Sequence, residues 1–264
     1  MPQDWITVAL YCFVGALCLI ALVYLAAPLL IQSQVAFDLN GTLREVALGG
    51  LSDADQHFFT RTSETLEPLG FLPLAHFVLE GMVPNVNATF QLLANPDTQA
   101  LALALVMQPS AGPSKRSLEF ASELAPRGKD PRIPINTTTS LDGLTPDADP
   151  VTVRHAFPEL SSPDDLVRIH DAIVKDTLQT AGPTRTLTPI PFDREPAEFF
   201  LEEMARELDG KADRGFWQKP SPGRYTLTLT GAYLMTWSQF PPFKQLRDAR
   251  HRRAAQAIRQ RLGV

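Results

Sequence analysis

Asp53, Asp55 and His57 alternate over five residues, and their side-chain types are those that bind transition metals. The segment nevertheless starts at Ser52 in the pattern of a helix N-terminus, with a serine that can cap the first turn and acidic residues inside that turn. Carboxylates are favoured there because they face the positive end of the helix dipole. We therefore interpret Asp53 and Asp55 as first-turn residues of a helix and expect no metal site.

Other residues that could do chemistry have no suitable partners in the sequence. Asp147 and Asp149 lack the glycine and the terminal glutamate of a calcium loop. His155 has no ligand-like partner at a fixed spacing, and His170 with Asp171 falls on an expected helix, where core or surface filling explains both. The motifs of metalloproteases, α/β-hydrolases, P-loop proteins and dinucleotide-binding folds are absent. We therefore predict no catalytic, cofactor-binding or metal-binding residue, which favours a protein that is not an enzyme.

The segment 243–262 concentrates positive charge. From residue 244 to the end there are seven basic residues against one acidic residue, whereas residues 34–243 hold 17 Lys and Arg against 27 Asp and Glu. Leu246, Ala254, Ile258 and Leu262 recur every four or eight residues, which predicts a helix with a narrow apolar stripe. Its basic residues could contact an anion or anionic lipid; they are Lys244, Arg247, Arg250, Arg252, Arg253, Arg259 and Arg261. The alternative is a basic helix that lies on the protein's own acidic body.

The position of all of these residues in the cell depends on the segment 5–31. This segment is an apolar run, WITVALYCFVGALCLIALVYLAAPLLI, with no charged side chain in 27 positions. About 20 residues that rise ~1.5 Å each cross a hydrocarbon core of ~30 Å. A cleaved secretory signal would have a basic start and a shorter run, and a core helix of a soluble protein would keep a polar stripe. We therefore predict a single-pass, uncleaved membrane anchor over 1–33, with membrane lipid as the partner of residues 5–31.

The side of the membrane that the rest of the chain occupies depends on few residues. Arg44 is the only basic residue within about 20 positions of the span, and it favours a cytoplasmic soluble part. Cys12 and Cys18 lie inside the span on different helix faces, so they cannot crosslink the soluble part. The glycosylation sequons at Asn40, Asn87 and Asn136 matter only if that part is lumenal.

Residues 34–182 are expected to form an α+β domain. One helix runs from Ser52 to Gly70, and a second begins at Ser162-Pro163-Asp164-Asp165, with a core face of Leu166, Ile169, Ile173 and Val174. Apolar patterns between these helices predict an antiparallel sheet of about five strands, at 74–79, 86–94, 99–108, 117–125 and 132–139. In 99–108 small residues alternate with large ones. We expect the large face to be core and the alanine face to lie against a helix, with a ligand as the alternative.

A proline-rich connector at 183–192 predicts a boundary, and 183–264 is expected to form a helix, a β-hairpin and a basic C-terminal helix. The run 208–231 carries Gly215-Phe216-Trp217, a loop, Arg224-Tyr225-Thr226-Leu227-Thr228 and Gly231. It resembles the wing of winged-helix transcriptional regulators, which implies DNA binding. The helix in the place of a recognition helix is acidic, however, and acidic side chains oppose the approach of phosphates.

The layout as a whole resembles that of single-span bacterial membrane proteins with no assigned function. Three hypotheses follow from the sequence. A non-catalytic, membrane-anchored binding or scaffold module, which could bind a protein partner, is the first, because sheet, helices and charge asymmetry are present without catalytic motifs. A tethered nucleic-acid-binding regulator and a tethered hydrolase are the alternatives, and nucleic acid is not the expected partner. The sequence predicts no cofactor and no oligomeric state.

Overall fold

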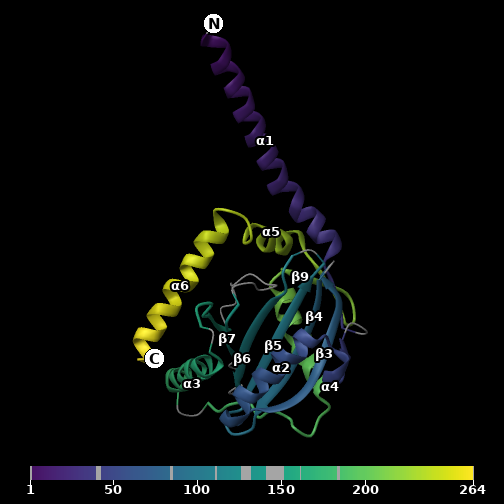
Figure 1. The fold of residues 1–264 in the computed structure, drawn as a ribbon, viewed down its shortest axis with the longest axis vertical. Helices are drawn as coiled ribbons and strands as arrows, with labels where there is room; N and C mark the ends of the chain where they lie inside the picture. Colours follow the sequence, from purple (N-terminus) through teal and green to yellow (C-terminus); the bar gives the residue numbers. More distant parts are fainter. Residues whose placement is uncertain are drawn as a thin grey trace.

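The computed structural model describes residues 2–39, 43–83, 86–110, 112–125, 132–140, 152–160, 162–182 and 185–263. Helix α1 (Pro2–Gln34) projects from the body of the protein as a stalk (Figure 1). It is long and apolar enough to cross a membrane, with a mean hydropathy of 2.6 over its most apolar stretch. All of its residues from Trp5 to Val23 are exposed, and burial begins at Tyr24. The body therefore meets the helix only over its last third.

A seven-stranded sheet forms the centre of the body, with the strand order β2-β3-β4-β5-β6-β7-β8 (Figure 1). Its strands are β2 (Leu43–Glu45), β3 (Leu72–Val83), β4 (Val86–Asn95), β5 (Ala100–Pro109), β6 (Lys115–Leu124), β7 (Ile133–Thr138) and β8 (Val153–Ala156). The pairs from β2 to β7 are antiparallel, and β7 pairs with β8 in parallel.

The prediction of an antiparallel sheet of about five strands is therefore wrong in two respects: the described residues place seven strands in this sheet, and the sheet is mixed. The five expected segments are β3 to β7 and are neighbours in chain order. The two additional strands lie at the edges and have only three and four residues, too few for an alternating apolar pattern to show. The parallel pairing of β8 depends on the crossover after β7, which sequence periodicity does not reveal.

Two helices cover one face of this sheet. They are α2 (Asp53–Leu66), which a 3-10 turn η2 (Glu67–Leu69) extends, and α3 (Pro163–Ala181). A second 3-10 turn, η1 (Leu48–Gly50), precedes α2. Phe59 and Leu66 of α2 and Ile173 of α3 belong to one buried cluster with Ala102 and Ala104 of β5. Small side chains on the sheet let the helices approach closely, so the prediction that a helix lies on the alanine face is confirmed.

The opposite face of the sheet is covered by α4 (Pro196–Asp213) and by a small antiparallel sheet, β1-β10-β9. Its strands are β1 (Ala36–Asp38), β9 (Trp217–Ser221) and β10 (Arg224–Leu227). Phe77, Phe90, Trp217 and Tyr225 are buried in the second core cluster, and Phe200 of α4 packs against it. Leu101 and Leu103 of β5 also face this side but are only partly buried, which corrects the expectation that the large face of β5 is fully core.

The last elements are α5 (Leu229–Trp237) and α6 (Phe243–Leu262). Helix α5 lies where α1 enters the body, and α6 runs from there along one side of the molecule toward α3 (Figure 1). Ala255 and Ile258 of α6 are buried in the first core cluster. Segments on both sides of the proposed boundary at 183–192 thus share their cores, since β1 pairs with β10 and α4 packs on the large sheet.

Candidate functional site

A cavity of about 380 Å³ lies between α4 and the face of the large sheet that α2 and α3 leave uncovered. Its apolar wall includes Leu101 and Leu103 from β5 together with Phe200 and Met204 from α4. Phe200 and Met204 lie one turn apart on α4, so they share the helix face that points at the sheet. Ligand sites are typically concave, mainly apolar and furnished with a few polar groups. The cavity is concave and mainly apolar.

Polar groups enter the cavity from β6. Glu119, Ala121 and Glu123 occupy alternate positions and line the cavity, while Leu118, Phe120 and Leu124 belong to the core on the opposite face of the sheet. Alternation of this kind usually indicates a strand with one solvated face. Here α4 covers that face, so the side chains of Glu119 and Glu123 are only 28% and 18% exposed.

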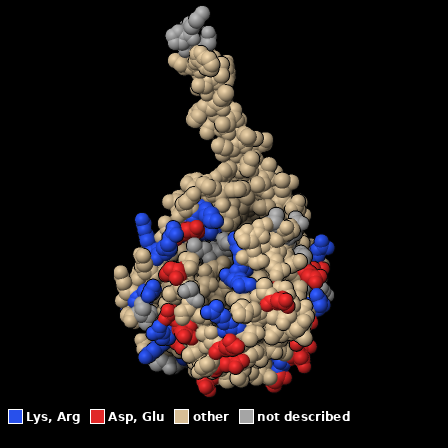
Figure 2. All heavy atoms as spheres, viewed as in Figure 1, with Lys and Arg blue, Asp and Glu red and all other residues tan. Residues whose placement is uncertain are grey.

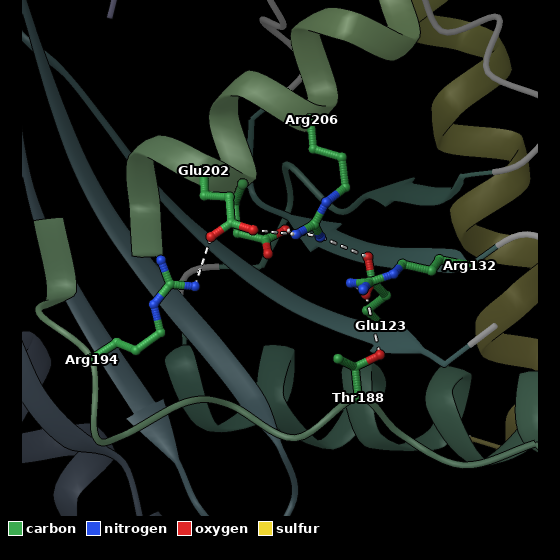
Figure 3. Close-up of polar contacts among 7 residues, drawn as sticks. Glu123, Arg132, Thr188, Arg194, Glu202 and Arg206 are labelled. Carbon is green, nitrogen blue, oxygen red and sulfur yellow. Dashed lines mark hydrogen bonds and ion pairs between the residues drawn. The ribbon is translucent and has the colours of Figure 1, made fainter. Parts of the chain in front are cut away.

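Glu123 is the centre of an ionic chain that links α4 to the sheet (Figure 3). Its carboxylate accepts a hydrogen bond from Arg132 Nη1 at 2.7 Å and from Thr188 Oγ1 at 3.1 Å, and Arg206 Nη1 lies 3.6 Å away. Only 18% of the Glu123 side chain is exposed. Since Thr188 belongs to the segment between α3 and α4, one carboxylate joins β6, that segment and α4.

The chain continues along α4. Arg206 Nη1 donates to Glu203 at 2.8 Å, and its other terminal nitrogen lies 3.7 Å from Glu202, which in turn accepts from Arg194 at 2.6 Å. The hydrogen bond from Arg194 holds the pKa of Glu202 below its usual range. Burial has the opposite effect on Glu203 and raises its pKa, although Arg206 opposes the rise. The pKa values of these two adjacent carboxyl groups are therefore shifted in opposite directions.

Glu119 is the second carboxylate that β6 contributes to the cavity, and 28% of its side chain is exposed. Burial raises its pKa; Arg154 of β8, 3.8 Å away, opposes this rise, and Glu207 adds to it. Lys211 of α4 forms an ion pair with Glu207 at the same side of the cavity. Each acidic group named here thus has a basic partner, and the carboxylates are fixed in position.

Asp55 and His57, which the sequence presents as candidate metal ligands, have different surroundings on α2. Asp55 is buried and accepts a hydrogen bond from Gln108 Nε2 at 2.7 Å, while its backbone N–H is capped by Ser52. His57 is exposed on α2. Within the described ranges, no three His, Cys, Asp or Glu side chains are grouped so as to hold a metal ion. Asp147 and Asp149 lie outside the described residues, as does the sequon at Asn40.

His170 is a core residue. It is 1% exposed, and its two ring nitrogens contact Ser122 Oγ and Thr137 Oγ1, each at 3.0 Å. Burial lowers its pKa to about 4, so the ring is neutral near pH 7. A neutral ring can donate from one nitrogen and accept at the other, which suits two hydroxyl partners. Burial also lowers the pKa of His155 on β8, and nearby Arg261 and His251 lower it further.

The basic residues of α6 have different surroundings. Lys244, Arg250, Arg252 and Arg253 are exposed, and Arg259 is partly buried. Arg261 Nη2 donates to Asp176 of α3 at 2.8 Å, and Arg247 forms an ion pair with its neighbour Asp248. The charge of this helix is therefore partly balanced by the body.

The hairpin that resembles a wing is part of the body's core. Tyr225 is fully buried, its hydroxyl donates to Asp209 at 2.7 Å, and Lys219 donates to the same carboxylate at 2.8 Å. Strand β10 pairs on its other side with β1, which directly follows α1. Arg224 is exposed. Asn87 is exposed at the start of β4, whereas Asn136 of β7 lines the cavity.

Sequence reasoning did not identify Glu119, Glu123, Glu203 or Arg206. One signal could have found them. Helix α4 has an apolar face with Phe200 and Met204, which must pack on the sheet. Strand β6 carries acidic groups on one of its two faces, and these groups would then lie beside α4. The fold and cavity together define a mixed α+β body on a single apolar helix. No family model, curated protein or solved structure matches this chain.

Proposed function

We propose that the protein is a membrane-anchored, non-catalytic binding module whose ligand site is the cavity between α4 and the large sheet. The observation that carries this proposal is the combination of an apolar wall with fixed, charge-paired carboxylates in one cavity. Such a site suits a small molecule with an apolar body and one polar group, because the body gains from burial and the polar group finds hydrogen-bonding partners. Helix α1 would keep this site at the membrane surface.

The test uses the full chain in lipid nanodiscs with ¹³C-labelled methionine methyl groups. Met204 lines the cavity, and Met107 of β5 lies outside its lining. The probes are naphthalene-2-methanol, naphthalene-2-carboxylate and 2-naphthylmethylammonium, which share one ring and differ in charge. We expect at least one probe to shift the Met204 resonance in a saturable manner and to leave Met107 unchanged.

Two matched substitutions locate the binding. Ala121→Phe fills the cavity from β6, and Ala257→Phe adds the same ring at an exposed position of α6. The shift should disappear with the first substitution and persist with the second. If no probe shifts Met204, or if Ala121→Phe binds as the wild type does, the cavity is not the ligand site.

A tethered hydrolase is the second candidate, because the raised pKa values of Glu119 and Glu203 are suited to a general acid in a cavity. The double variant Glu119→Gln, Glu203→Gln separates the two functions. A hydrolase would cleave p-nitrophenyl esters, phosphates or glycosides faster than this variant does. A binding module would show equal background rates for both proteins. The nucleic-acid regulator stays a prediction from the wing-like segment; binding that weakens steeply with salt would support it.

A further inference from the structure

The exposed part of α1 has the length of a bilayer's apolar core. Nineteen residues, from Trp5 to Val23, make no contact that buries them, and at ~1.5 Å per residue they extend ~28 Å against the ~30 Å of hydrocarbon. Burial of α1 begins at Tyr24, where α5 packs against it. A bilayer that surrounds the exposed part would therefore end at the level of α5.

Helix α5 is joined to α1 by polar contacts at this level. Trp237 Nε1 donates to the carbonyl of Tyr24 at 3.1 Å, and the Tyr233 hydroxyl donates to the carbonyl of Leu25 at 3.3 Å. In return, the hydroxyl of Tyr24 donates to the carbonyl of Pro241 just before α6. The rings of Tyr24 and Phe240 lie 5.1 Å apart. Aromatic side chains with a polar edge are typical of the interface between hydrocarbon and water.

The surface beside these contacts is apolar. Residues 227–243 contain no charged side chain. Helix α5 buries Gly231, Ala232 and Thr236, and Met235 packs against the second core cluster. The exposed apolar side chains of α5 and the start of α6 are Leu229, Leu234, Trp237, Phe243 and Leu246, and Leu246 is 64% exposed. On the face drawn in Figure 2, the described part of the stalk and the top of the body are uncharged, and the charged groups lie below them.

We propose that residues 229–246, which we call the collar, lie in the interfacial layer of the same bilayer that α1 crosses. This inference rests on the membrane anchor of the proposed function and adds a second contact that fixes the body against the lipid. The collar is continuous with the exposed stretch of α1 and lies at the end of the body from which α1 emerges (Figure 1). A soluble protein seldom exposes so contiguous an apolar patch, and burial in the interface removes it from water.

Charge at the edge of the collar agrees with this placement. The first charged residue after the uncharged stretch is Lys244, which is exposed in the first turn of α6. A long basic side chain there can reach the headgroup layer while its apolar stem stays with Phe243 and Leu246. From this point α6 leads away from α1 (Figure 1), so its later arginines lie farther from the lipid.

The depth of single nitroxide labels tests the proposal in the full chain, reconstituted in phosphatidylcholine nanodiscs on a Cys12→Ser, Cys18→Ser background. Labels at Leu234→Cys and Leu246→Cys report on the collar. Val14→Cys reports on the anchor, and Ala257→Cys on α6 is the reference in water. Collision rates with oxygen and with a water-soluble nickel chelate give the depth of each label.

We expect Val14 to be deep, Ala257 to be in water, and the two collar labels to have intermediate depth, with access to the nickel chelate several-fold lower than at Ala257. Collar labels as accessible as Ala257, together with a deep Val14, would overturn the collar and leave the anchor intact. A Val14 label in water would overturn the anchor and the collar with it. Circular dichroism of each labelled chain confirms that it is folded.

Discussion

The indole N–H of Trp237 donates a hydrogen bond to the backbone carbonyl of Tyr24, in place of the N–H that Pro28 lacks. In an α-helix the carbonyl of residue 24 would accept from the N–H of residue 28, but proline has none. Trp237 Nε1, 213 residues away in the chain, donates to that carbonyl at 3.1 Å. A tertiary contact thus satisfies a backbone carbonyl that Pro28 would otherwise leave without its helical partner.

Trp237→Phe should loosen α5, since it removes the donor and keeps an aromatic ring. An acceptor left without a partner costs roughly 1–3 kcal/mol, so amide hydrogen exchange over residues 229–237 should accelerate about tenfold. On a Pro28→Ala background the helix supplies its own N–H, and the same substitution should have a smaller effect. Hydrogen exchange with mass spectrometry measures both, with Trp5→Phe as the control. Equal acceleration in the two backgrounds would contradict the link between Trp237 and Pro28.

Two helical glycines should respond in opposite directions to alanine. A Cβ at Gly231 in α5 would lie 2.1 Å from the carbonyl oxygen of Phe216, whereas a Cβ at Gly210 in α4 would have nothing within 4 Å. Gly231→Ala should therefore destabilise the protein by about 1–3 kcal/mol through a backbone clash. Gly210→Ala should stabilise it by roughly 0.5–1 kcal/mol, because alanine favours the helix. Chemical denaturation of the full chain in detergent measures both, and changes of the same sign would contradict the packing of α5 on Phe216.

Buried His170 should make the fold sensitive to acid. Its folded pKa of about 4 is below the ordinary value of 6.5, so the folded state disfavours the protonated ring. The contribution of the neutral ring to the free energy of unfolding is fully present above pH 6.5. It is lost as the pH falls from about 6.5 to about 4, by up to about 3 kcal/mol. His170→Gln should be less stable than the wild type at pH 7.5 and should have a flatter stability profile below pH 6.5. Denaturant titrations across this range test it, with the exposed His57→Gln as control; parallel profiles would contradict the assignment.

The sequence predicts the elements of this fold better than their arrangement. The helix at 5–31 and the five central strands follow from apolar runs and alternation, which depend on neighbouring residues. The point where the body meets α1 depends on Trp237, and local patterns carry no information about so distant a partner. Strand β6 shows the same limit. Its alternation predicts the strand correctly, but whether water or α4 covers Glu119 and Glu123 is decided by packing.

Removal of the Glu119 charge should stabilise the protein at neutral pH and above. Burial raises the pKa of this carboxyl, so the folded state binds its proton more tightly than the unfolded state does. The contribution of the protonated Glu119 side chain to the stability of the fold is present below the ordinary glutamate pKa of about 4.3. It is lost as the pH rises through the pKa of Glu119 in the folded state. Glu119→Gln keeps the shape of the protonated group and does not titrate.

The melting temperature of Glu119→Gln should therefore exceed that of the wild type at pH 8, and the two should converge as the pH falls toward 4.5. Glu202→Gln is the matched control with the opposite sign, because the hydrogen bond from Arg194 lowers the pKa of Glu202 and favours its charge. Thermal unfolding of both variants between pH 4.5 and 8 measures the contrast. If Glu119→Gln is less stable than the wild type at pH 8, the ion pair with Arg154, 3.8 Å away, outweighs the cost of burial. The carboxylate would then serve mainly to attach β8 to β6 and not to offer a polar group to a ligand.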